Sequence, residues 1–200
     1  RCLEFKDPAV RKVAADNLKK LGVEGLVVIG GDGSFTGAKC LSDEQGINVV
    51  GIPGTIDNDL AYTDYTLGFD TAVNTVLWAI NALRDTMTSH DRVSLVKVMG
   101  RRCGDIALYA GICGGAEYIL VPEVPYDIQK IANEIKKNRE HGKTANVIVL
   151  AEGAGNENEI KTIVSVISGT DVKVTTLGHI QRGGSPSMAD RMLAAKFGVH

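Results

Sequence analysis

Apolar residues recur along the chain in two rhythms that predict strands and helices in turn. Short runs rich in apolar or β-branched residues, which are typical of strands in parallel sheets, occupy 26–29, 49–52, 93–99, 118–121, 147–150 and 172–177. Apolar residues at helical spacing predict helices over about 8–21, 34–41, 71–88, 105–112, 128–138, 159–168 and 188–197. Strands that alternate with helices indicate an α/β fold with mostly parallel sheets and right-handed crossovers.

Local signals place several of the boundaries. Asp7 and Pro8 are a capping residue and a first-turn proline, and Gly22 ends the helix that they begin. Ser34 is expected to cap the helix after the first strand. The long polar loop 53–70 is the expected point at which the chain leaves one sheet and begins another.

Composition allows a buried core and argues against several classes of partner. The chain has 200 residues, 44% of them hydrophobic, and a net charge of −2 from 22 basic and 24 acidic residues. No basic stripe indicates nucleic acid, and no apolar stretch approaches the roughly 20 residues of a membrane span. Four cysteines without metal-site spacing predict free thiols in a reducing cytoplasm. The first residues show neither a methionine nor a signal-peptide pattern.

A glycine-rich loop, 30–34, follows the first strand and places Asp32 among three glycines. Bare backbone lets N–H groups approach phosphate oxygens closely, and the N-terminus of the next helix favours an anion. Asp32 would then hold Mg²⁺. The loop lacks the Gly-Lys-Ser/Thr ending of a Walker loop and fits a dinucleotide fingerprint poorly, so a tight turn without a ligand stays open.

A second loop after a strand, 53–59, holds Thr55, Asp57 and Asp59. Carboxylates two residues apart in an extended segment point to opposite sides, so different tasks are expected of them. One can accept a proton from an attacking hydroxyl, which is worth about 10²–10⁴ in rate. The other can orient the hydroxyl or contact metal-bound water. Turn formation without chemistry is the alternative.

Three further strand ends carry charged residues. His179 and Arg182 are suited to a phosphomonoester, Arg101 to transition-state charge, and Glu152 to sugar hydroxyls. Each alone is explained as well by a surface loop or a surface charge. The carboxyl ends of parallel strands meet at one edge, however, and ligands bind there.

The stretches GGDGS, PGTIDNDL, VMGR, LAEG and LGHIQRGGSPS, in this order, make the chain similar to the phosphofructokinase family over essentially its whole length. The resemblance implies a glycolytic phosphotransferase that moves the γ-phosphoryl of ATP to the 1-hydroxyl of fructose 6-phosphate, with Mg²⁺. It also implies two Rossmann-like sheets with flanking helices. Residues 1–68 and 181–200 would form the ATP/Mg-binding domain and residues 69–180 the sugar-phosphate domain.

The resemblance also implies roles for individual residues. Asp57 matches the base, Arg101 a stabiliser of the transition state and Thr55 a contact to the transferring phosphate. Asp59 matches an acidic residue that supports the magnesium site, and Asp32 the magnesium ligand. The implied sugar-phosphate contacts are Thr55, Ile56, Asp57, Met99, Gly100, Arg101, Glu152, His179 and Arg182. The implied ATP contacts are Arg1, Cys2, Gly31, Asp32, Gly33 and Ser34.

Further matches concern assembly and regulation. Arg92 and Lys173 match positions that reach into a neighbour's substrate pocket, and family members are usually homotetramers. An allosteric nucleotide site, with ADP or phosphoenolpyruvate as possible effectors, is implied in part by Arg84, Gly115, Glu117 and Lys143. His141 and Thr144 stand where some bacterial members carry lysines, which argues against strong control by these effectors.

The choice of phosphate donor follows from two glycines. Pyrophosphate-dependent relatives typically carry aspartate where Gly33 stands and lysine where Gly54 stands, so glycine at both leaves room for ATP. A pyrophosphate-dependent enzyme and a non-catalytic binding module of the same fold stay as alternatives. A lipid or NAD kinase does not account for the GHIQRGGSP loop. We expect Asp32 and Asp57 to meet across one cleft.

Complete family members are longer than this chain. An upstream strand with its glycine-rich phosphate loop and a closing downstream segment are expected to be missing. The chain would then be an internal fragment, and we expect it to be weakly active or inactive by itself.

Overall fold

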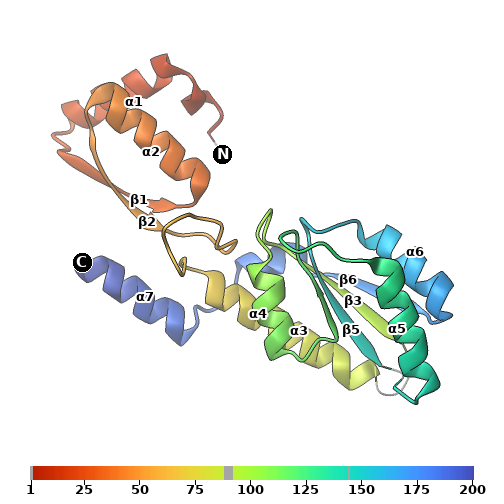
Figure 1. Cartoon of the computed structure of the whole chain (residues 1–200). Coiled ribbons are helices and arrows are strands. Elements are labelled where there is room, and N and C mark those ends of the chain that lie inside the picture. Colours follow the sequence, from red (N-terminus) through yellow and green to blue (C-terminus); the bar gives the residue numbers. More distant parts are fainter. Residues whose placement is uncertain (1, 88–91, 144) are drawn as a thin grey trace. The chain divides into compact units, whose positions relative to one another are not determined.

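The computed structural model describes residues 2–87, 92–143 and 145–200 (Figure 1). It divides the chain into two compact units. Unit 1 comprises Arg1–Thr55 and Leu60–Thr63, and unit 2 comprises Ile56–Asp59 and Asp64–His200. Parallel strands alternate with helices in both units, so the predicted α/β class is confirmed.

Unit 1 is a two-stranded parallel sheet with helices on one face. β1 (Gly25–Gly30) pairs with β2 (Asn48–Pro53), so that Gly25 lies opposite Asn48. A 3-10 turn at Glu4–Lys6 precedes the helices α1 (Pro8–Lys20) and α2 (Asp32–Gln45). The core is Ala15, Leu41 and Ile47, packed against Phe5, Leu18, Leu26 and Val49. The other face of the sheet exposes Val27, Ile29 and Val50.

The two helices of unit 1 begin in different ways. Asp7 caps α1 by accepting from the Ala9 N–H (2.9 Å), and Pro8 is its first residue, as predicted. Ser34 does not cap α2, contrary to expectation. Gly31 is the N-cap, and the Ser34 N–H donates to Gly31 O (3.0 Å), so Ser34 already lies in the first helical turn.

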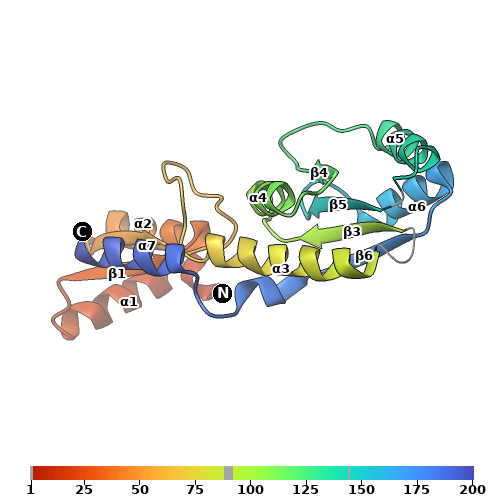
Figure 2. The ribbon, with the colours of Figure 1, turned by 90° about the horizontal axis from the view of Figure 1, so that it is seen from below.

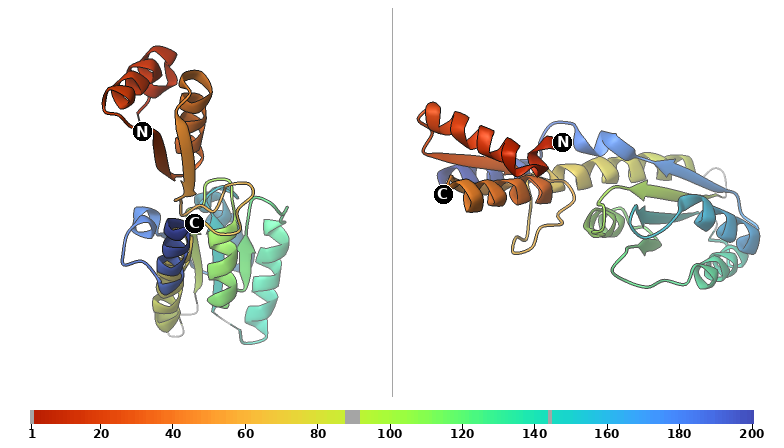
Figure 3. Two further views of the ribbon diagram at one scale, coloured as in Figure 1. Left: turned by 90° about the vertical axis from the view of Figure 1, so that its left-hand side faces the viewer. Right: turned by 90° about the horizontal axis from the view of Figure 1, so that it is seen from above.

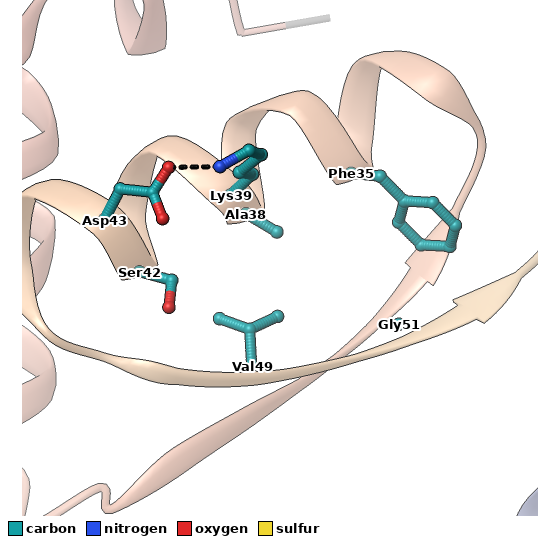
Figure 4. A pocket seen from close by; sticks show the side chains of 7 residues that line it. All are labelled: Phe35, Ala38, Lys39, Ser42, Asp43, Val49 and Gly51. Carbon is teal, nitrogen blue, oxygen red and sulfur yellow. Dashed lines mark hydrogen bonds and ion pairs between the residues drawn. The ribbon is translucent and has the colours of Figure 1, made fainter.

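A pocket of about 270 Å³ lies between α2 and β2 (Figure 4). Phe35 projects from α2 over Gly51, where a Cβ atom would come 3.0 Å from the aromatic ring. Lys39 and Asp43 form an exposed ion pair along the same helix. None of the residues that line this pocket is a predicted site residue, and we assign it no function.

Unit 2 is built on a four-stranded parallel sheet in the order β4-β5-β3-β6 (Figure 2). The strands are β3 (Val93–Val98), β4 (Tyr118–Leu120), β5 (Asn146–Ala151) and β6 (Val172–Thr176). Val93 lies opposite Asn146 on one side and opposite Val172 on the other. The carboxyl ends of β5, β3 and β6 therefore lie side by side at one edge of the sheet.

Helices cover both faces of this sheet, and the layers can be followed in Figure 3. α3 (Phe69–Met87) and α4 (Asp105–Cys113) pack on the face that carries Val96, Val98 and Val149. α5 (Ile128–Glu140) and α6 (Glu157–Ser168) pack on the face that carries Leu95, Ile148 and Leu150. Successive strand residues alternate between the faces, so a continuous apolar run such as β5 is buried on both sides.

The last helix, α7 (Met188–Val199), is tied to the start of α3. Asp190 is buried, and its carboxylate accepts from the N–H groups of Gly68 (2.8 Å) and Thr71 (2.9 Å) and from the Thr71 hydroxyl. These contacts all lie within unit 2. The grouping of 181–200 with 1–68, and of 69–180 as a second domain, stays a prediction.

Three further features of the described residues complete the fold. No described helix is both long and apolar enough to cross a membrane. Cys2, Cys40, Cys103 and Cys113 are free thiols. A 3-10 turn at Gly178–Arg182, which the sequence pattern does not predict, follows β6.

Candidate functional site

Three neighbouring strands of unit 2 end at predicted site residues. The residues 99–101 follow β3, Glu152 follows β5, and the 3-10 turn Gly178–Arg182 follows β6. Backbone hydrogen bonds hold these ends together, because the Glu152 N–H donates to Val98 O (2.9 Å) and the Leu177 N–H to Lys97 O (3.1 Å). The structure thus brings three of the predicted loops to one edge of the sheet.

Arg101 occupies a tight turn with an unusual backbone. The φ angle of Arg101 is +57° and that of Gly100 is +131°. Residues other than glycine adopt such positive φ angles at an energetic cost. The Arg101 N–H donates to Glu152 Oε1 (2.7 Å). Gly153 passes so close that a Cβ atom there would overlap Arg101 O. The residues after β5 therefore hold this turn in place.

The Arg101 side chain bonds to one of the paired carboxylates. Its Nη1 donates to Asp59 Oδ2 (2.8 Å). The Asp59 side chain is 16% exposed, and its Oδ1 is buried without a hydrogen bond to any described residue. A buried unpaired oxygen is costly, and here it remains available to a ligand donor or to cation-bound water.

Asp57 is 8% exposed, and burial is the main cause that raises the pKa of its carboxyl. The negative charges of Asp59 and Glu152 raise this pKa further, whereas the positive charges of Arg101 and Arg182 lower it. A carboxylate with a raised pKa is a stronger proton acceptor. The environment of Asp57 therefore suits a general base.

The sequence predicts an extended backbone between the two carboxylates, but the structure shows a different conformation. Asn58 has a φ of +52°, in the left-handed region that asparagine tolerates better than most residues. The argument that Asp57 and Asp59 point to opposite sides of an extended segment is therefore wrong. Their environments still differ, because Asp57 is buried and Asp59 is bonded to Arg101.

The turn after β6 is anchored by a buried amide. Gln181 is 1% exposed, its Oε1 accepts from the Met99 N–H (3.2 Å), and its Nε2 donates to Gly178 O (2.9 Å). His179 and Arg182, on either side of it, are exposed. Gln181 thus fixes His179 and Arg182 relative to the end of β3.

A cavity of about 320 Å³ lies beside this turn. Ile56, Gly68, Arg182 and Asp190 are among the residues that border it. Two of them, Ile56 and Arg182, are predicted site residues, so open space adjoins the candidate site within unit 2.

The loop predicted to hold phosphate leads from β1 into α2 in unit 1. The N-cap residue, Gly31, has no side chain to cap the first turn. A Cβ atom on Gly31 would come 3.3 Å from Thr55 Cβ, whereas one on Gly33 would meet no atom within 4 Å. Bare backbone at a helix N-terminus is suited to an anion.

Asp32 is an exposed carboxylate in the first turn of α2. Mg²⁺ usually takes one or two protein carboxylates and completes its shell with phosphate oxygens and water. The described residues contain no group of three or more His, Cys, Asp or Glu placed to hold a metal. A single exposed carboxylate beside this glycine-rich loop is compatible with the predicted role of Asp32, provided that the ion brings most of its own ligands.

Arg92 and Lys173 lie at the opposite, amino-terminal edge of the unit 2 sheet. Both pair with Asp171, at 3.6 Å and 3.0 Å. A strand of six residues spans about 20 Å, so these two side chains are remote from Arg101 and Glu152 of their own chain. Their implied role across an interface stays a prediction.

The residues implied in an allosteric site are brought together. Arg84 donates to Gly115 O, and Glu117 pairs with Lys143 at 3.2 Å and lies 4.0 Å from Arg84. Glu117 also accepts from the Val147 N–H (2.7 Å), at the amino end of β5. The cluster is a charged surface site, and its regulatory role stays a prediction.

The remaining predicted positions are Cys2, His141, Arg1 and Thr144. Cys2 is exposed, with its thiol 3.4 Å from Glu4 Oε2. His141 follows α5, and its Nδ1 lies 2.7 Å from Lys137 O. Arg1 and Thr144 lie outside the described residues.

Two side-chain amides of this site, Asn58 and Gln181, were not predicted from the sequence. Both lie inside the motifs PGTIDNDL and LGHIQRGGSPS, next to predicted site residues. An amide carries donors and acceptors together and so can join loop backbones. An amide inside a site motif was therefore a signal that could have identified both residues. The sequence alone does not show which groups an amide joins.

The architecture and the site define a parallel-sheet α/β protein with a polar site at the carboxyl ends of its strands. The family model for phosphofructokinase matches residues 1–200. The chain belongs to the phosphofructokinase family, which confirms the resemblance.

Curated relatives are similar along the whole chain. It is 61% identical over 198 residues to the ATP-dependent 6-phosphofructokinase of Clostridium tetani, which covers 99% of this chain and 62% of that protein. It is 60% identical over 199 residues to ATP-dependent 6-phosphofructokinase 1 of Clostridium perfringens, with 100% and 62% covered. The chain therefore spans 62% of the length of these relatives.

Solved structures confirm the fold. Phosphofructokinase from Saccharomyces cerevisiae aligns with a TM-score of 0.89 and 35% identity, over 98% of this chain and 30% of that one. The T-state structure of Pichia pastoris phosphofructokinase aligns with a TM-score of 0.89 and 34% identity, over 100% of this chain and 25% of that one.

Proposed function

We propose that the protein transfers the γ-phosphoryl group of ATP to the 1-hydroxyl of fructose 6-phosphate, giving fructose 1,6-bisphosphate and ADP. The observation that carries the proposal is the arrangement around Asp57. This buried carboxyl with a raised pKa shares one sheet edge with the Arg101–Asp59 pair and with Arg182. The names of the curated relatives support the reaction. A place in cytoplasmic glycolysis is part of the same proposal.

In this proposal Asp57 acts as the general base. It accepts the proton of the 1-hydroxyl while that oxygen bonds to the γ-phosphorus and the bond to the β-phosphate oxygen breaks, releasing ADP. Arg101 offsets the negative charge on the transferring group, and Thr55 contacts the same phosphate. Positioning and charge neutralisation dominate such reactions, and base assistance contributes about 10²–10⁴ in rate.

The acceptor sugar is held by the other strand ends of unit 2. His179 and Arg182 are both exposed. The cationic guanidinium of Arg182 and a ring N–H of His179 can donate hydrogen bonds to the 6-phosphate. Glu152 accepts hydrogen bonds from sugar hydroxyls with the carboxylate that also holds the Arg101 N–H. The backbone at 99–100 lines the same edge. In a homotetramer, Arg92 and Lys173 of a neighbouring subunit complete the phosphate contacts.

The donor is ATP with Mg²⁺, bound by the loop 31–34 and by residues 1–2. Asp32 would hold the ion, which when bound neutralises charge on the phosphates. The space at Gly33 leaves room for a nucleotide. A Cβ atom at Gly54 would come 3.0 Å from Ile29 Cγ2 and 3.4 Å from Gly30 N, so a lysine there, as in pyrophosphate-dependent relatives, would be crowded.

Regulation is part of the proposal in a weak form. The cluster of Arg84, Gly115, Glu117 and Lys143 offers two cations and a carboxylate to an ADP-like or phosphoenolpyruvate-like effector. Glu117 already pairs with Lys143 and adjoins Arg84, so an anion would have to compete for both cations. We therefore expect modest effector binding at most.

The experiment must allow for the length of the chain. We would replace the matched segment of the Clostridium tetani relative by residues 1–200 and call the product the chimera. Its turnover of fructose 6-phosphate with ATP, and with pyrophosphate in place of ATP, is measured by a coupled assay. The proposal predicts that the chimera turns over fructose 6-phosphate with ATP and not with pyrophosphate. It also predicts weak or no turnover by the 200-residue chain itself.

Asp57→Ser tests the catalytic assignment in the chimera. We expect turnover to fall by about 10²–10⁴ while fructose 6-phosphate binding, measured by calorimetry, persists. Asp43→Ser changes an exposed carboxylate of α2 and serves as the control. Unchanged turnover of the Asp57 variant would reject the assignment, and absence of turnover in the chimera with sugar binding retained would favour a non-catalytic module.

A further inference from the structure

Asn58 separates the two carboxylates of the candidate site and uses its whole side chain in hydrogen bonds. Its Oδ1 accepts from the Thr66 N–H (3.0 Å) and from the Thr66 hydroxyl (3.2 Å). Its Nδ2 donates to Asp105 Oδ2 (2.7 Å) and to Asp64 O (3.2 Å). An asparagine amide has two donor hydrogens and two acceptor lone pairs, so its bonding capacity is filled.

The backbone of Asn58 is held from a further direction. Its carbonyl oxygen lies 3.9 Å from the Cys103 sulfur, which donates to it. Burial raises the pKa of the Cys103 thiol to about 11, so this group stays protonated at neutral pH and keeps its donor. The Cys103 N–H in turn donates to Gly100 O (2.9 Å), which closes the turn that carries Arg101.

Asn58 thus joins its own loop, which carries Asp57 and Asp59, to one region that is distant in sequence. That region is the turn of residues 100–103 together with the start of α4 at Asp105, which follows it directly. The loop between β2 and α3 contains no helix or strand, so its conformation depends in large part on such side-chain contacts. The left-handed φ of Asn58 also restricts which residues this position accepts.

We propose that Asn58, held by Asp105, is a positioning residue for the reaction, an inference that rests on the proposed function. Through this contact Asn58 keeps Asp57 buried in its base-like environment and keeps Asp59 within bonding distance of Arg101. Neither Asn58 nor Asp105 touches the reacting atoms. A displacement of about 1 Å in such a group is enough to slow an enzyme about 10²-fold.

The test exchanges the two partners of the hydrogen bond. In the chimera, Asn58→Asp places two carboxylates against each other, and we expect kcat to fall about 10²-fold while KM for fructose 6-phosphate changes by less than about 3-fold. Asp105→Asn still offers an acceptor oxygen, so kcat should change by less than about 3-fold. Asn58→Asp combined with Asp105→Asn restores a donor to the pair, and we expect it to recover at least about 10-fold of the loss.

A second variant keeps the backbone and removes the contacts. Asn58→Gly accepts the left-handed conformation without strain, so its effects report the side-chain bonds. Tyr62→Gly is the matched control, because Tyr62 has a φ of +65° in the same loop but a fully exposed side chain. The pKa of Asp57, followed by carboxyl-carbon NMR in the 200-residue chain, should fall towards its ordinary value in the Asn58 variant only. The acid limb of the kcat–pH profile should move to lower pH with it.

The outcomes separate this inference from the proposed function. If the unmodified chimera shows no turnover, the proposed function fails, and the NMR experiment still tests the positioning role. If Asn58→Gly leaves the pKa of Asp57 unchanged, the positioning role is rejected. It is rejected equally if Asn58→Asp slows turnover and the paired exchange recovers none of it, because the loss would then not depend on the bond to Asp105.

Discussion

Replacing Gln181 by leucine tests whether the turn after β6 is held by the amide described above. Leucine has a similar volume but no polar atoms, so the change removes two hydrogen bonds without opening a large cavity. The Met99 N–H and the Gly178 carbonyl lose their partner. The side chain is 1% exposed, so water does not readily replace it.

The size of the effect follows from these two bonds. A buried polar group left without a partner costs about 1–3 kcal/mol, and Gly178 is only partly buried, so we expect about 2–4 kcal/mol in total. For a chain of this size each kcal/mol lowers Tm by about 2–4 °C, which gives a fall of about 4–16 °C. The looser turn should also weaken binding of fructose 6-phosphate through His179 and Arg182.

Differential scanning calorimetry of the 200-residue chain measures the fall in Tm, and titration calorimetry measures sugar-phosphate binding. Gln129→Leu, an exposed glutamine at the start of α5, is the control and should leave both unchanged. A Tm of the Gln181→Leu variant within about 1 °C of the parent would mean that the amide contributes no net stability, contrary to this prediction.

Three more predictions follow from burial and close contacts. Asp57→Asn should raise Tm at pH 7, because the folded pKa of Asp57 is raised and its ionised form destabilises the fold. The gain should shrink as the pH falls through that pKa and vanish below about 4; a pH-independent gain would contradict this. Gly153→Ala should cost about 1–3 kcal/mol of unfolding free energy by overlap with Arg101 O, whereas Gly198→Ala, with no atom within 4 Å, should not destabilise. Alkylation of Cys103, followed by mass spectrometry, should stay slow until the pH nears its pKa of about 11, and rapid modification at pH 8 would be the contrary result.

Much of the fold could be predicted from the rhythm of apolar residues. β5 is buried along its whole length, and an uninterrupted apolar run such as 147–150 indicates a strand covered on both faces. The start of α1 follows from Asp7 and Pro8 because capping is a local interaction. The start of α2 was predicted less accurately, since Gly31 rather than Ser34 is its N-cap.

The candidate site was predictable in its residue types and not in its connections. Charged residues after successive strands indicate a shared edge, because parallel strands end together. The left-handed Asn58 and the amide of Gln181 depend on partners far along the chain, Asp105 and Met99. No local pattern encodes which distant group an amide reaches, so only the three-dimensional structure reveals these contacts.

The most direct test of the proposed acceptor site is a structure of the chain with fructose 6-phosphate bound. We expect the 1-hydroxyl oxygen to lie about 2.6–3.2 Å from the Asp57 carboxylate, and the 6-phosphate to contact His179 and Arg182. A sugar phosphate bound away from these residues, or one whose 1-hydroxyl turns away from Asp57, would contradict it.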